Sequence, residues 1–141
     1  MPDFYRYFKE NMDGLGLPAP ETLFGSLQAT VANATVILSQ VDKFGKAVTI
    51  SELISAGKKI EQLATIGACS AAFYVGAVIG SIAVATGRSL SGGTSIADVI
   101  FTACRHNLDR PWLVTTLQRY PDLYEKRTVA RDMYRYQAAV A

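Results

Sequence analysis

The sequence predicts an all-α protein, a compact helical bundle around a central apolar helix or helical hairpin. Apolar residues recur at spacings of three and four along most of the chain, and no segment alternates like a half-buried strand. Half of the 141 residues are hydrophobic, only 18% are charged, and the mean hydropathy is +0.17. Residues 22–41 and 62–87 contain no charged side chain. We therefore expect an apolar centre, with the charged residues at the chain ends and in the connections between helices. The length is that of a single domain, residues 1–141.

A short amphipathic helix followed by a linker is expected over residues 1–20. Asp3 is a suitable N-cap, and the helix should end near Asn11. The apolar face of this helix is formed by Phe4, Tyr7 and Phe8. The linker contains the helix breakers Gly14, Gly16, Pro18 and Pro20. The N-terminus has no apolar stretch ending in a cleavage site, so a secretory signal peptide is not expected.

The second predicted helix begins at Glu21 and ends between Asp42 and Lys46. Its apolar residues alternate spacings of four and three and form a narrow seam for a neighbouring helix: Leu27, Val31, Ala34, Leu38 and Val41. Amides and hydroxyls lie off that seam, which favours a helix packed within the bundle over a membrane span.

A capping box predicts the start of the third helix at residues 49–52. Thr49 can accept a hydrogen bond from the N–H of Glu52, whose carboxylate can reach back to the N–H of Thr49. Gly57 is expected to kink this helix. After Glu61 the polar face of the helix disappears, and the helix is expected to continue into an apolar run.

This apolar run, residues 63–86, is the feature on which the functional prediction depends. As one helix its 24 residues would extend ~36 Å, more than the ~30 Å hydrocarbon thickness of a bilayer. Small residues recur at every fourth position: Ala68, Ala72, Gly76 and Gly80. They would form one stripe that lets another helix approach closely, so the sequence predicts a membrane and self-association face. The alternative is the buried central helix of a soluble bundle.

A glycine-rich loop and another apolar helix follow this run. The loop is predicted to contain Gly87, Gly92 and Gly93. The helix should be capped by Thr94 or Ser95 and end at Arg105. Its apolar face is expected to consist of Ile96, Val99, Ile100 and Ala103. Residues 61–105 are therefore expected to form an apolar hairpin. The loop superficially resembles a phosphate-binding loop, but Gly93 stands where that motif needs lysine, which favours a plain hairpin turn.

The C-terminal third, residues 107–141, is predicted to form two basic amphipathic helices. The first begins at residues 109–111 and ends before Pro121, with an apolar face of Trp112, Leu113 and Leu117. The second spans residues 122–137 and carries Arg127, Arg131 and Arg135, with tyrosines nearby. This pattern suits an anionic lipid surface, and a solvated helix with its tyrosines facing the core is the alternative. RNA phosphate would fit the same pattern, but a net charge of only +2 gives no reason to expect a nucleic-acid partner.

The sequence contains no catalytic constellation, metal-ligand set or cofactor motif. His106 is the single histidine, and on a helix it would point to a different face from Cys104. We therefore predict no catalytic residue, no metal and no cofactor. A helical enzyme would need a pocket with perturbed ionisable groups. Cys69 and Cys104 both lie in apolar stretches, and whether they pair is left open.

The run from Phe73 to Ala85, with the glycine-rich turn and apolar helix after it, resembles the glycine-zipper hairpins of small pore-forming toxins. In particular, residues 62–104 are similar to short antibacterial effectors that the bacterial type VI secretion system exports. The resemblance implies a toxin made in the bacterial cytoplasm without a signal peptide and exported to act on a target cell membrane. It also implies a secretion-tube carrier and a cognate immunity protein as partners. It transfers no catalytic residue.

Together these features predict a protein that inserts into a lipid bilayer and permeabilises it as a homo-oligomer held by the small-residue stripe. The alternative is a soluble helical adaptor or immunity-type binding protein, which would cover its apolar surface against a protein partner. A chain that stays soluble and monomeric without detergent and is inert toward lipid would favour that alternative.

Overall fold

The computed structural model describes residues 4–57, 60–87 and 96–120, and within these ranges every regular element is a helix. The elements, in chain order, are α1 (Phe4–Gly14), α2 (Glu21–Phe24), α3 (Leu27–Phe44), α4 (Ile50–Ser55), the 3₁₀ helix η1 (Glu61–Ile66), α5 (Ala71–Gly87), α6 (Ile96–Arg105) and α7 (Leu113–Arg119). The predicted all-α class is therefore confirmed.

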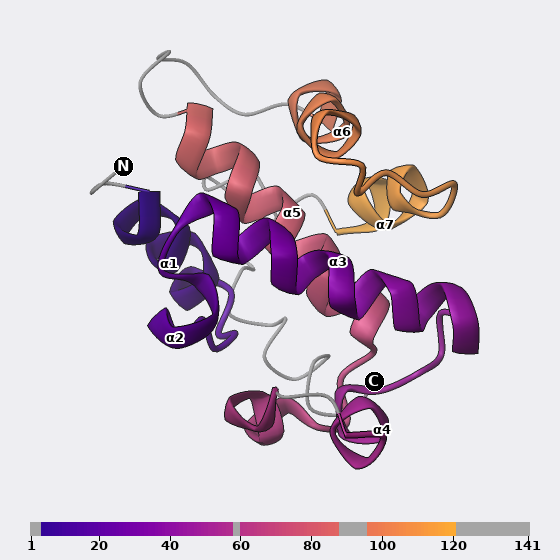
Figure 1. The fold of residues 1–141 in the computed structure, drawn as a ribbon. Helices are drawn as coiled ribbons and strands as arrows, with labels where there is room; N and C mark the ends of the chain where they lie inside the picture. The colour runs from indigo at the N-terminus through magenta and orange to yellow at the C-terminus, as the bar shows by residue number, and fades with distance from the viewer. Residues whose placement is uncertain (1–3, 58–59, 88–95, 121–141) are drawn as a thin grey trace.

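Helix α5 is the central element of the bundle. It packs against α1, α3, α6 and α7, and its side chains from Ala71 to Ala85 are buried. Figure 1 shows α3 crossing in front of α5, with α1 and α2 on one side and α6 and α7 on the other. The predicted arrangement around a central apolar helix is thus the one observed.

The first helices follow the predicted pattern with one break. Helix α1 buries Phe4, Phe8 and Met12, and it ends at Gly14 instead of near Asn11. The single helix predicted from Glu21 is divided at residues 25–26. The hydroxyl oxygen of Ser26 accepts a hydrogen bond from the N–H of Ala29 at 3.1 Å, so Ser26 is the N-cap of a new helix, α3.

Helix α3 confirms the predicted seam. Ala34, Leu38 and Val41 are buried, while Leu27 and Val31 are partly buried against the core. The helix ends at Phe44, within the predicted range. Its C-terminal turn also binds the segment before α7, because the guanidinium of Arg110 donates to both carboxylate oxygens of Asp42 at 2.9–3.2 Å. These hydrogen bonds hold the pKa of Asp42 below its usual value.

The capping box at the start of α4 is also confirmed. The N–H of Glu52 donates to Thr49 Oγ1 at 3.2 Å, and the N–H of Thr49 donates to Glu52 Oε1 at 2.9 Å. The prediction that Gly57 kinks this helix is wrong, because α4 ends before Gly57. The φ of Gly57 is +91°, in the left-handed region that glycine adopts without steric cost. Helix α4 itself stops at Ser55.

The prediction of one continuous helix over residues 63–86 is wrong. Residues 61–66 form η1, residues 67–70 are not helical, and α5 begins only at Ala71. Its 17 residues extend ~26 Å. The physical reason is that backbone groups of residues 67–71 are bonded to residues 48–51: Ile50 N–H to Cys69 O (3.0 Å), Ser51 N–H to Gly67 O (2.9 Å) and Ala71 N–H to Val48 O (2.9 Å).

Helix α6 ends at Arg105 as predicted, and its predicted caps Thr94 and Ser95 lie outside the described residues. Helix α7 begins at Leu113, later than the predicted start at residues 109–111, because residues 111–112 form a turn. Helix α6 buries Val99 and Ala103, and α7 buries Leu113 and Leu117. The turn after α6 has Asn107 at a φ of +59°, with a 2.7 Å bond from Leu108 N–H to Ala103 O that closes the helix end. Helix α6 packs against α5, and in Figure 1 it is seen nearly along its axis while α5 runs obliquely across the view.

Candidate functional site

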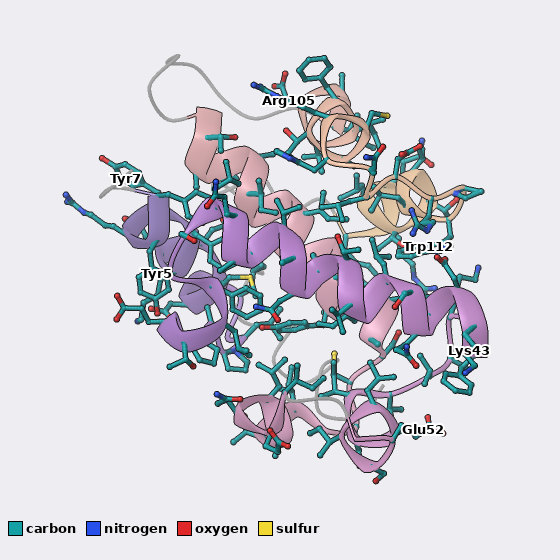
Figure 2. All side chains as sticks on the ribbon, in the orientation of Figure 1. Tyr5, Tyr7, Lys43, Glu52, Arg105 and Trp112 are labelled. Carbon is teal, nitrogen blue, oxygen red and sulfur yellow. The ribbon has the colours of Figure 1, made fainter. Side chains whose placement is uncertain are left out.

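The candidate site is the apolar segment that contains α5. The side chains of Val75, Ala77, Val78, Ile79, Ser81 and Ile82 are all fully buried. The segment as a whole, residues 62–87, carries no charged side chain. In Figure 2 the labelled charged residues Lys43, Glu52 and Arg105 lie on other helices, toward the outside of the bundle. Helix α5 is therefore apolar on every side and shielded by the other parts of the chain.

Two fully buried polar side chains of α5 have partners supplied by distant residues. Tyr74 is fully buried, and its hydroxyl donates to the carbonyl of Pro18 at 2.6 Å. Burial raises the pKa of Tyr74 well above its ordinary value. Ser81 is also fully buried, and its hydroxyl oxygen accepts from the amide of Asn11 at 2.8 Å. These two bonds fix α5 against α1 and the linker that follows it.

Aromatic rings connect α1 and α2 to α5. The ring centroids of Phe4 and Phe8 are 5.5 Å apart, those of Phe8 and Phe24 5.4 Å, and those of Phe24 and Tyr74 6.3 Å. We call Phe4, Phe8, Phe24 and Tyr74 the aromatic row. The sequence pattern placed Phe4 and Phe8 on an apolar face but gave Phe24 and Tyr74 no role. At the other side of α5, Phe73 meets Tyr120 edge to face at 5.1 Å.

The structure brings together three of the four residues of the predicted small-residue stripe. Ala72, Gly76 and Gly80 lie on α5 and are buried, so this face is covered within the monomer. Ala68 precedes α5 in the non-helical segment and is exposed, so in this structure it does not lie on the stripe. The reason is the break at residues 67–70, which separates Ala68 from the helix.

The other predicted site residues fall at or beyond the end of the described segment. Gly87 is the last residue of α5. Gly92 and Gly93 of the predicted loop lie outside the described residues. The same is true of Arg127, Arg131 and Arg135, which were predicted to contact an anionic surface.

The two cysteines are both free thiols, and the structure does not pair them. Cys104 is exposed, whereas Cys69 is buried. Burial raises the pKa of the Cys69 thiol to about 12, so this thiol is protonated and a poor nucleophile at neutral pH. His106 is the C-cap residue of α6 and is half-buried. Within the described ranges no three metal-ligating side chains gather at one place.

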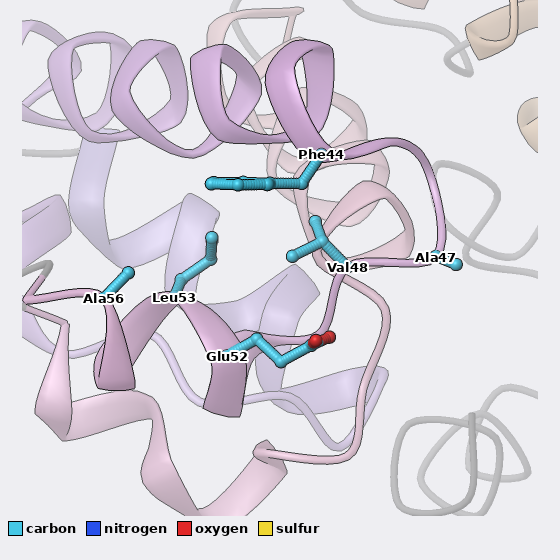
Figure 3. A pocket seen from close by; sticks show the side chains of 6 residues that line it. All are labelled: Phe44, Ala47, Val48, Glu52, Leu53 and Ala56. Atoms are coloured by element: carbon cyan, nitrogen blue, oxygen red, sulfur yellow. The ribbon is translucent and has the colours of Figure 1, made fainter.

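A pocket of about 430 Å³ opens between the end of α3 and α4 (Figure 3). It is lined by Phe44, Ala47, Val48, Glu52, Leu53 and Ala56. Its single ionisable wall residue is Glu52, whose Oε1 already accepts two hydrogen bonds from Thr49. The remaining walls are aliphatic and aromatic, so the pocket offers apolar contact and no acid–base pair.

No protein-family model, curated protein or solved structure matches this chain. As for membrane spans, none of the helices described by the structure combines the length and the apolar character needed to cross a bilayer. The site is thus a charge-free segment, residues 62–87, that is broken at residues 67–70 and whose helix α5 is enclosed by amphipathic helices.

Proposed function

We propose that this protein acts on membranes: its apolar segment, residues 62–87, leaves the bundle, inserts into a lipid bilayer and permeabilises it. The observation that supports the proposal most directly is that α5 is buried on all sides and carries no charge. Such a surface needs an apolar environment, which the folded protein and the hydrocarbon of a bilayer can both provide. The apolar side chains of α5 are therefore out of water both in the folded bundle and in the bilayer.

The proposal requires the break between η1 and α5 to close. Helix α5 alone covers ~26 Å, which is less than the ~30 Å hydrocarbon core. A continuous helix over residues 62–87 would cover ~39 Å and could span the core with some tilt. The polar residues within it are Gln62 at its start, Tyr74, and serines and threonines, whose hydroxyls can bond to the carbonyl of the preceding turn.

Self-association through the small-residue stripe is part of the same proposal. Ala72, Gly76 and Gly80 lie one turn apart on α5 and become available to another chain once α5 leaves the bundle. Small side chains allow helix backbones to approach closely, so van der Waals contact can hold helices together in lipid. A homo-oligomer in the bilayer follows from this packing.

The biological setting rests on the resemblance alone. An antibacterial effector of the type VI secretion system would be made in the bacterial cytoplasm and carried out by a secretion-tube protein. It would depolarise the target cell and be opposed in the producing cell by a cognate immunity protein.

Dye release from vesicles tests the proposal. The purified chain, added to vesicles of mixed neutral and anionic lipids loaded with a self-quenched dye, should release the dye in proportion to the protein added. Bacteria that express the chain conditionally should lose membrane potential, followed with a potential-sensitive dye. Intact vesicles and an unchanged potential would overturn the proposal.

A second candidate is a helical adaptor or immunity-type binding protein, and one observation favours it. Phe44 is 54% exposed at the edge of the 430 Å³ pocket, where an apolar side chain of a partner could be accommodated. A chain that remains monomeric in solution and leaves vesicles intact, while it binds a protein through this pocket, would establish the second candidate in place of the first.

A further inference from the structure

We infer that the contact between residues 46–51 and 67–71, called the latch here, keeps the apolar segment divided and α5 inside the bundle. This inference rests on the proposed function, because it concerns how the insertion of that segment is controlled. The latch joins the turn before α4 and the first residues of α4 to the segment between η1 and α5 and the first residue of α5.

The geometry of the latch is that of a short antiparallel pairing. Thr49 and Ser70 form an isolated antiparallel bridge, with Ile50 N–H bonded to Cys69 O and Ala71 N–H to Val48 O beside it. Ser70 adds a side-chain bond, since its hydroxyl donates to Lys46 O at 3.0 Å. One half of the pairing is fixed by the capping box of α4, which holds Thr49.

The latch bonds replace the bonds of a continuous helix. In an α-helix through this region, Ala71 N–H would donate to Gly67 O and Phe73 N–H to Cys69 O. In the structure Gly67 O accepts from Ser51 N–H, and Cys69 O accepts from Ile50 N–H. Ala71 N–H donates to Val48 O, and Phe73 N–H donates to Ser70 Oγ at 3.3 Å.

Opening the latch therefore leaves donors and acceptors that match one another. The groups released by residues 48–51 can bond to water, while those of residues 67–73 can pair as helical turns. In lipid this pairing is obligatory, because no water is present to satisfy the backbone. Entry into a bilayer thus favours the open latch, and the aqueous fold favours the closed one.

A reversible cross-link tests the latch. Thr49 and Ser70 face each other as a non-hydrogen-bonded antiparallel pair, in which Cα atoms are ~4.5 Å apart, within the range a disulfide spans. We would make Thr49→Cys and Ser70→Cys in a Cys69→Ala, Cys104→Ala parent. The oxidised protein should release dye about tenfold or more slowly than its reduced form, and the reduced form at least as fast as the parent.

The same chain, oxidised and reduced, provides its own control for the four substitutions. Equal dye release by the oxidised and reduced forms, with the disulfide verified by mass, would overturn the latch and leave the proposed function standing. Release by neither the parent nor the reduced form would overturn the proposed function, and the latch with it.

A second variant, Ala71→Pro, tests the continuous helix without a disulfide. Proline is tolerated at the first residue of a helix, so α5 should persist in water. The substitution also removes the latch bond from Ala71 N–H to Val48 O, and that loss alone would speed dye release, so a loss of release identifies the requirement for a continuous helix. In a helix continued through residues 67–71, the same proline removes the bond to Gly67 O and clashes with the preceding turn. Dye release should be lost while the helix content in water stays at the parent level. Release at the parent rate would contradict the inference.

Discussion

Replacement of both Gly76 and Gly80 by leucine is expected to abolish dye release from vesicles. The two leucines would widen the stripe by which membrane-inserted helices approach, and association through small residues tolerates little added bulk. Both glycines are buried, so each leucine also overpacks the aqueous bundle and costs about 1–3 kcal/mol of unfolding free energy. The variant must therefore be delivered to vesicles from denaturant, which removes differences in the stability of the aqueous fold.

The matched control is the double replacement of Ala77 and Ala85 by leucine. Both alanines are buried on α5, but they lie off the stripe. This control should be destabilised in water to a similar extent and yet retain most of the dye release. Equal release by the two double variants would show that the stripe has no role in permeabilisation.

Replacement of Phe8 by alanine is expected to lower the free energy of unfolding by about 3–5 kcal/mol. Phe8 is fully buried in the aromatic row, with the rings of Phe4 and Phe24 at 5.5 and 5.4 Å. Domains of this size are stable by only about 5–15 kcal/mol, so the loss is a large part of the total. Urea unfolding measures it.

The same variant should also release dye faster, because a weaker contact between α1 and α5 makes it easier for α5 to leave the bundle. Phe101→Ala is the control, since Phe101 is 66% exposed and its loss should change stability by no more than about 0.5 kcal/mol. A Phe8→Ala protein with wild-type stability would contradict the structure. A destabilised protein with an unchanged rate of release would contradict the proposal that α5 leaves the bundle.

Helices with local signals could be predicted from the sequence. The seam of α3, the capping box at Thr49 and Glu52, and the apolar face of α6 are patterns of neighbouring residues, and the structure confirms each of them. The division of the apolar run could not be predicted in this way. It depends on main-chain bonds such as the one from Ala71 N–H to Val48 O, which join segments distant in sequence whatever their side chains are.

The candidate site, too, could be predicted from the sequence only where neighbouring residues define it. Spacing alone identified Ala72, Gly76 and Gly80 as one stripe, because all three lie on the same helix. The polar partners of α5 are set by the tertiary fold. Asn11 was predicted only as the end of a helix, yet its amide donates to Ser81, 70 residues further along the chain.

The most direct test of the central claim is the environment of Ala68 with and without lipid. Ala68 is exposed in the bundle, yet it lies within the charge-free segment proposed to enter the bilayer. An environment-sensitive fluorophore on Ala68→Cys, in the Cys69→Ala, Cys104→Ala parent, reports whether this position is in water or lipid. The same fluorophore on Ala47→Cys, an exposed position outside the segment, is the control. With vesicles, emission from position 68 should shift to the blue and become shielded from an aqueous quencher, while position 47 stays in water. If position 68 stays in water while vesicles leak, or responds as position 47 does, the apolar segment does not enter the membrane.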